Sequence, residues 1–161
     1  MRWLVALLLF LACVAAAVAG TWGYGQFDND QSLDTSSDWA ESGTIESIQA
    51  ALTLATSAKY LDSDDAVNAL VAAEVVAASL GNANKDLPAD LAAWLRAQPR
   101  DRLHALAPEA LAAVERVRSS DGSELRELWG DQDLEGWLTQ VDDLASRLRI
   151  EAAGLAETNS D

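Results

Sequence analysis

The chain has few of the residues that form covalent cross-links, metal sites or catalytic triads. Its 161 residues include one cysteine, one histidine and three prolines. The cysteine is Cys13, inside an N-terminal apolar run, so the rest of the chain can form no disulfide and depends on packing for its stability. The histidine, His104, has no nearby cysteine or second histidine, so no zinc site is indicated. Because the serines lie in contexts typical of turns and helix caps, no serine triad is predicted.

Positive charge is also scarce. Lysine and arginine number 11 against 26 aspartates and glutamates, which gives a formal net charge of −15. A surface of this charge repels phosphate backbones and anionic lipid headgroups, so we expect no nucleic-acid partner. The same charge suits a basic protein partner.

The longest hydrophobic run lies at the N-terminus and has the three parts of an export signal. Arg2 supplies a positive charge, residues 3–19 are apolar, and Ala17-Val18-Ala19 before Gly20 matches the small-x-small pattern of a cleavage site. We therefore predict that residues 1–19 are a signal peptide. The chain is then secreted or lies in the cell envelope, outside the cytoplasm.

Two alternatives remain open for this segment. Its length is at the lower limit for crossing a bilayer, so residues 3–19 could stay as an uncleaved transmembrane anchor. That anchor would be the only contact with a membrane and would leave the domain outside. Leu11-Ala12-Cys13 also resembles a lipid-attachment motif, although Phe10 fits that motif poorly.

The remainder of the chain has the spacing of helices and not of strands. No stretch alternates apolar and polar residues, whereas helical periodicity recurs from residue 30 onward. We predict an all-α fold, a compact single-domain bundle of about six or seven helices over residues 20–155, with a frayed tail over residues 156–161. The signal or anchor helix precedes this bundle. The expected helices cover residues 30–41, 45–55, 63–80, 88–98, 102–118 with a break near Pro108, 124–129 and 134–153.

Particular residues are predicted to begin these helices. Asp28 or Asn29 caps the first helix, Thr44 caps the second, and Ser123 caps the short helix that follows the turn at 119–122. Pro88 takes the first position of its helix, where a missing N–H is tolerated.

A segment rich in glycine and aromatic residues precedes the first helix. Residues 22–30 read Trp-Gly-Tyr-Gly-Gln-Phe-Asp-Asn-Asp. This run resembles the opening signature of the bacterial family called domain of unknown function 4259, and residues 72–78, 91–95 and 123–129 resemble later parts of that family. The residues that carry the resemblance are Trp22, Gly23, Gly25, Phe27, Asp28, Asn29, Asp30, Trp39, Glu74, Trp94, Trp129 and Trp137.

The resemblance implies a helical domain over residues 20–155, and it implies no activity. Members of that family usually begin at the signature, without an export segment ahead of it. Cleavage after Ala19 would leave Gly20 at the N-terminus, which agrees with a domain that begins there.

The signature segment has two interpretations. In the structural one, the glycines let the chain fold tightly, so that Trp22, Tyr24 and Phe27 lie on the bundle and the following carboxylates start a helix. In the alternative, Asp28, Asp30 and Asp34 hold a metal ion. A calcium loop of the EF-hand type does not fit, because apolar residues occupy its glycine and glutamate positions.

Glu74 falls on the apolar side of its helix, beside Val67 and Leu70. A carboxylate in that position is expected to be buried and to need a partner. The partner would be an arginine, amides of the glycine segment or a tryptophan N–H. The alternative is a catalytic acid.

The sequence favours a binding protein over an enzyme. Trp94, Trp129 and Trp137 have the spacing of core residues, so they indicate packing and not a ligand cage, and no cofactor is predicted. We expect an exported acidic helical domain that binds a protein. One alternative is an immunity or antitoxin-like protein that neutralises a basic partner. The other is a metal-dependent hydrolase that uses the carboxylates of the signature segment with Glu74.

Overall fold

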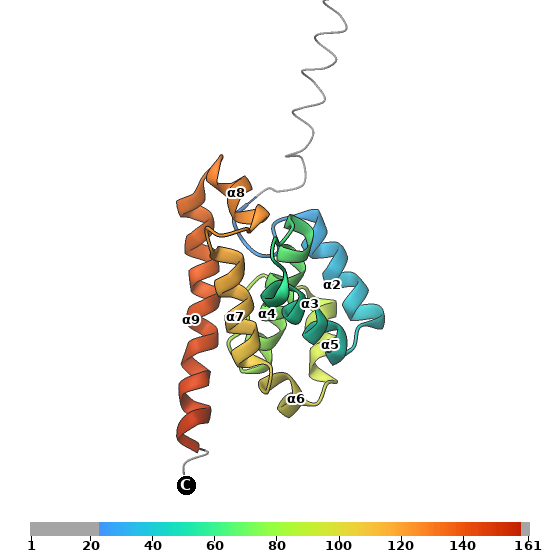
Figure 1. Ribbon diagram of the computed structural model, residues 1–161. Helices are drawn as coiled ribbons and strands as arrows, with labels where there is room; N and C mark the ends of the chain where they lie inside the picture. Colours follow the sequence, from blue (N-terminus) through green and yellow to red (C-terminus); the bar gives the residue numbers. More distant parts are fainter. Residues whose placement is uncertain (1–22, 159–161) are drawn as a thin grey trace, which may run out of the picture.

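The computed structural model describes residues 23–158, with side chains described for residues 23–149. This part of the chain is all-helical, as predicted (Figure 1). The helices are α2 (Asp30–Ser42), α3 (Ile45–Ser57), α4 (Ser63–Ser79), α5 (Ala89–Arg96), α6 (Arg100–His104), α7 (Ala107–Arg118), α8 (Glu124–Gly130) and α9 (Leu134–Thr158).

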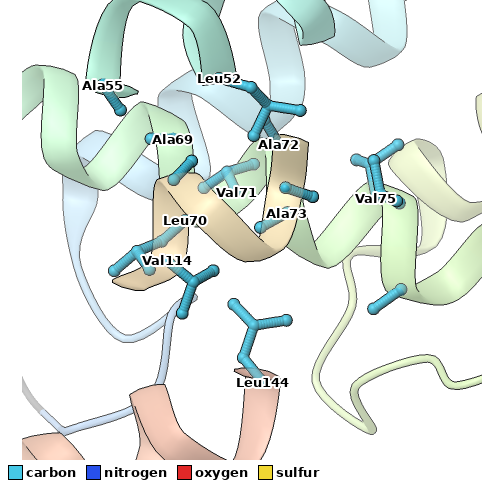
Figure 2. Packing of buried hydrophobic residues seen from close by; sticks show 14 of the residues in the cluster. Leu52, Ala55, Ala69, Leu70, Val71, Ala72, Ala73, Val75, Val114 and Leu144 are labelled. Atoms are coloured by element: carbon cyan, nitrogen blue, oxygen red, sulfur yellow. The ribbon is translucent and has the colours of Figure 1, made fainter. Parts of the chain in front are cut away.

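Helix α4 is the centre of the bundle. Its residues from Ala66 to Ala77 are all buried except Asn68, and a helix that is apolar almost all round is stable only when other elements surround it. Helices α2, α3, α7, α8 and α9 each pack against it. Figure 2 shows Leu52 of α3, Val114 of α7 and Leu144 of α9 in the core that forms around α4.

Most predicted helix starts are confirmed, with differences at the caps. Asn29 caps α2, because its Oδ1 accepts a hydrogen bond from the backbone N of Ser32 at 2.8 Å. Thr44 caps α3 as predicted. Pro88 is the N-cap of α5, one position earlier than expected. Ser123 is the N-cap residue of α8 as predicted, but its hydroxyl donates to the carbonyl of Val117 at 2.7 Å and makes no capping hydrogen bond.

The predicted break near Pro108 divides the fifth expected helix in two. Helix α6 ends at His104, and Pro108 lies in the first turn of α7. Proline has no backbone N–H, and its ring collides with the carbonyl four residues earlier, so a helix through this point is kinked or, as here, broken.

Two loops that are far apart in sequence meet below α8. Leu61 donates a backbone hydrogen bond to Gly122 at 2.9 Å and accepts one from Glu124 at 3.0 Å. This isolated parallel bridge joins Leu61 to Ser123, and no strand accompanies it within residues 23–158. Gly122 has a φ of 67°, which suits a residue without a Cβ.

Several predictions fall partly or wholly outside the described residues. The signal peptide over residues 1–19, the alternative anchor over residues 3–19 and Trp22 all lie there. Among the helices that the structure does describe, none combines the length and the apolar character needed to cross a bilayer. Helix α9 runs to Thr158, and fraying of residues 156–161 stays a prediction.

Candidate functional site

The signature segment folds back on itself through Asp28. The backbone N of Gly25 donates to Oδ2 of Asp28 at 3.0 Å, and the backbone N of Asp28 donates to the carbonyl of Gly25 at 3.1 Å. A Cβ on Gly25 would lie 2.9 Å from the same Oδ2. A side chain at position 25 would therefore push this carboxylate out of its hydrogen bond with the backbone.

The three carboxylates proposed as metal ligands do not converge. Asp28 faces the glycine turn, whereas Asp30 and Asp34 are exposed on α2. No group of three histidine, cysteine, aspartate or glutamate side chains within residues 23–149 is arranged to hold a metal ion. Glu74 is fully buried and paired with an arginine.

Tyr24 attaches the signature segment to the C-terminal helices. Its hydroxyl donates to Oδ2 of Asp133 at 2.7 Å, and its ring centroid lies 5.5 Å from that of Trp129. Trp129 stacks in turn on Trp137, with centroids 6.3 Å apart and an interplanar angle of 10°. The hydrogen bond from Tyr24 lowers the pKa of Asp133, and Asp133 raises the pKa of Tyr24. Phe27 is buried, as the structural interpretation requires.

A pocket of about 230 Å³ opens between the signature segment, the start of α4 and helix α8. Its wall is formed by aromatic and aliphatic side chains, and its polar groups come from the signature segment and the helix starts. The lining residues are Tyr24, Gly25, Gln26, Asn29, Asp30, Gln31, Ser63, Asp64, Val67, Leu70, Leu125, Leu128, Trp129 and Trp137.

Gln26 is the unusual polar residue of this pocket. The residue is only 5% exposed, and its Nε2 has no hydrogen-bond partner among residues 23–149. An unpaired buried donor costs about 1–3 kcal/mol. Nothing in the sequence marks Gln26 as a residue of a site, because glutamine within a polar turn carries no signal of burial.

Exposed carboxylates follow one another along α2, and two carboxylates at the start of α4 share hollows with two of them; we call these residues together the acidic face. It consists of Asp30, Asp34, Asp38 and Glu41 of α2 together with Asp64 and Asp65 of α4. Asp30 and Asp64 line the pocket described above, and Asp38 and Asp65 line a second hollow beside it. None of the six belongs to an ion pair within the part of the chain that the structure describes.

Side-chain hydrogen bonds join the two helices of the acidic face. The side chains of Gln31 and Thr35 on α2 both donate to Oδ1 of Asn68 on α4, at 3.2 and 2.7 Å. Partial burial and the negative charges of Asp62 and Asp64 raise the pKa of Asp65. Of these causes only Asp64 belongs to the acidic face, so the shift comes mainly from burial and from Asp62.

Glu74 has an arginine partner, one of the alternatives that the sequence left open. It is fully buried, and Arg147 of α9 holds both of its carboxylate oxygens at 2.8 and 2.7 Å. Asn84 donates a third hydrogen bond at 3.0 Å. Burial disfavours the charged guanidinium, but the attraction of Glu74 and Asp143 outweighs it and raises the pKa of Arg147. The satisfied pair indicates a structural role.

The remaining candidates serve packing. Trp39 and Trp94 are half-buried against the core, and Nε1 of Trp94 donates to the carbonyl of Gly43 at 3.1 Å. A Cβ on Gly43 would lie 2.7 Å from Cα of Trp39, which makes glycine necessary between α2 and α3. His104 is half-buried, and its Nε2 lies 2.9 Å from the carbonyl oxygen of Ser79.

Comparison with known proteins identifies a family and no further relative. The sequence pattern of the family described as Domain of unknown function (DUF4259) matches residues 20–140. No curated protein and no solved structure matches the chain.

Proposed function

Because the chain belongs to the family described as Domain of unknown function (DUF4259), whose description names no activity, we propose a function from the structure. The domain binds a basic protein through the acidic face and is not an enzyme. The observation that carries this proposal is the set of six unpaired carboxylates on α2 and α4, two helices that side-chain hydrogen bonds join.

The acidic face is unfavourable for the domain on its own. Asp30, Asp34 and Asp38 follow one another at intervals of four residues, so they are neighbours on the surface of α2. Each such like-charged pair destabilises a helix by about 0.2–0.5 kcal/mol. Lysine or arginine side chains of a partner would remove this repulsion and would also speed the encounter.

The immunity protein and the metal-dependent hydrolase differ in how well they agree with the arrangement of the carboxylates. An immunity or antitoxin-like protein would use the same acidic face, and it differs only in that the basic partner is a toxin. A metal-dependent hydrolase would need Asp28, Asp30 and Asp34 close together, and these three do not converge. We therefore retain the immunity protein as the second candidate.

Export is part of the proposal. If residues 1–19 are a cleaved signal peptide, the acidic face meets its partner outside the cytoplasm. N-terminal sequencing of the exported chain is expected to begin at Gly20. A sequence that begins at Met1 would instead support the uncleaved anchor.

Neutralising the acidic face is expected to weaken binding of a basic probe. In the full chain carrying Asp34→Asn, Asp38→Asn and Glu41→Gln, affinity for a decalysine peptide at low salt should fall roughly threefold to a hundredfold, because three exposed charge pairs contribute about 0.2–1 kcal/mol each. Calorimetric titration over a series of salt concentrations measures this change.

The control variant neutralises three carboxylates that lie outside the acidic face. Asp101, Asp121 and Asp131 are exposed and lie outside the acidic face, and changing them to asparagine alters the net charge equally. That variant should retain most of the affinity. Equal losses in the two variants would show that net charge alone attracts the peptide and would contradict the proposed face.

A further inference from the structure

We propose that the pocket beside the signature segment receives one arginine side chain of the protein partner. This inference rests on the proposed function, because it assigns the pocket to the same partner as the acidic face.

The size of the pocket suits a single side chain. At about 230 Å³ it is smaller than the ~300–1,000 Å³ typical of sites for small molecules. An arginine side chain is long and narrow, and its aliphatic stem can pack on apolar surface while its charged end meets polar groups. Leu128, which is 47% exposed, and Trp129 offer that apolar surface.

The aromatic rings and the carboxylates that line the pocket both favour a planar cation. Tyr24 and Trp129 form an aromatic wall, and Tyr24 is already fixed by its hydrogen bond to Asp133. A guanidinium stacks on such rings and also binds carboxylates through two parallel hydrogen bonds. Asp30 and Asp64 supply unpaired carboxylates, and no lysine or arginine lines the pocket to compete for them.

An anion is not favoured at this site, although both α2 and α4 begin at the pocket. At the start of α2, the backbone N of Ser32 already donates to Oδ1 of Asn29 at 2.8 Å. At the start of α4, the backbone N of Ser63 donates to Oε2 of Glu124 at 2.7 Å, and the N of Asp65 donates to Oδ1 of Asp62 at 2.9 Å. These amides are already paired with side-chain oxygens, so they cannot serve a phosphate or sulfate.

Gln26 lines the pocket, and in the proposed complex its side chain rotates so that Nε2, which has no exposed surface in the described structure, reaches an acceptor of the ligand. This Nε2 is a buried donor without a partner among residues 23–149. Arginine carries only donors in its side chain, so the acceptor must be a backbone carbonyl beside it. A peptide segment supplies both groups, whereas a free guanidinium ion supplies only one.

The test compares two peptides that differ only in charge. The full chain is titrated with acetyl-Gly-Arg-Gly-amide and with the same peptide carrying citrulline, which has the shape of arginine without its charge. The indole N–H signal of Trp129 in NMR spectra reports occupation of the pocket. The arginine peptide is expected to bind roughly fivefold to a hundredfold more tightly, from stacking and two charge pairs.

Matched variants locate the binding site. Asp30→Asn with Asp64→Asn should weaken binding of the arginine peptide, whereas Asp34→Asn with Asp38→Asn, which has the same charge, should weaken it less. Gln26→Met should weaken binding while leaving the melting temperature equal or higher, because the unpaired donor is removed. A Gln26→Met variant with unchanged affinity would overturn the role given to the amide.

The results separate this inference from the proposed function. Equal binding of the arginine and citrulline peptides, or an unmoved Trp129 signal, would overturn the pocket inference. The proposed function would still stand if the Asp34, Asp38 and Glu41 variant weakens decalysine binding. The opposite result is also informative. If the arginine peptide binds the pocket but the Asp34, Asp38 and Glu41 variant binds decalysine as tightly as the unchanged chain, only the proposed role of the acidic face is contradicted.

Discussion

Replacing Arg147 with alanine is expected to lower the free energy of unfolding by about 3–5 kcal/mol, because the fully buried carboxylate of Glu74 would lose its charged partner. Asn84 would remain as a donor, but one amide does not offset a buried charge. Urea denaturation at neutral pH, followed by circular dichroism, measures this loss.

The same helix provides a matched control. Arg149 lies two residues further along α9, its side chain is half-exposed, and it pairs with Glu115. Because exposed ion pairs contribute about 0–1 kcal/mol, Arg149→Ala should have a small effect. If the free energy of unfolding falls equally little in Arg147→Ala and Arg149→Ala, the Glu74–Arg147 pair does not make the contribution to stability proposed for it.

A double variant distinguishes the cost of an unpaired buried charge from the cost of losing the side chains that fill the site. With Glu74→Leu and Arg147→Met together, no buried charge is left unpaired, and such replacements range from neutral to about 1–4 kcal/mol more stable. The double variant should therefore recover most of the stability that Arg147→Ala loses. A double variant as unstable as the single one would show that shape, and not charge, is the important property of this site.

Replacing Leu52 with alanine is expected to lower the free energy of unfolding by about 2–5 kcal/mol. The side chain of Leu52 is fully buried between α3 and α4, as Figure 2 shows, and its removal leaves a cavity in the core. Alanine is abundant around it, including Ala55, Ala69 and Ala72. Small neighbours cannot fill a cavity without movement of the helices, so the loss should lie towards the upper end of the range.

Leu54 on the same helix provides the comparison. It is 44% exposed, so Leu54→Ala deletes the same atoms from a site that is largely in solvent already. Its loss in urea denaturation should be less than half of that for Leu52→Ala. Similar losses for the two variants would contradict the packing of α3 against α4.

Local patterns in the sequence were sufficient for the helices and for the burial of single residues. The stripe of Ile45, Ile48, Leu52 and Ala55 predicted the buried side of α3, and all four are buried. Glu74 was identified as buried because its place on the helix follows from 3.6 residues per turn. The sequence did not decide which residue caps α2, since the choice between Asp28 and Asn29 depends on the conformation of the turn that precedes the helix.

The candidate site could not be predicted in the same way. Nothing in the sequence distinguishes Arg147 from the other arginines as the partner of Glu74, because the choice depends on how α9 crosses α4. Similarly, Gln26 in a polar turn gave no sign of burial.

The sequence by itself determined an acidic, all-helical domain with a distinctive glycine-aromatic segment ahead of its first helix, because periodicity, caps and charge are local properties. The tertiary structure alone decided that carboxylates of α2 and α4 line shared hollows and that Tyr24, Gln26 and Trp129 enclose a pocket. Such contacts join residues far apart in the chain. They depend on how whole helices pack against one another, which no local pattern specifies.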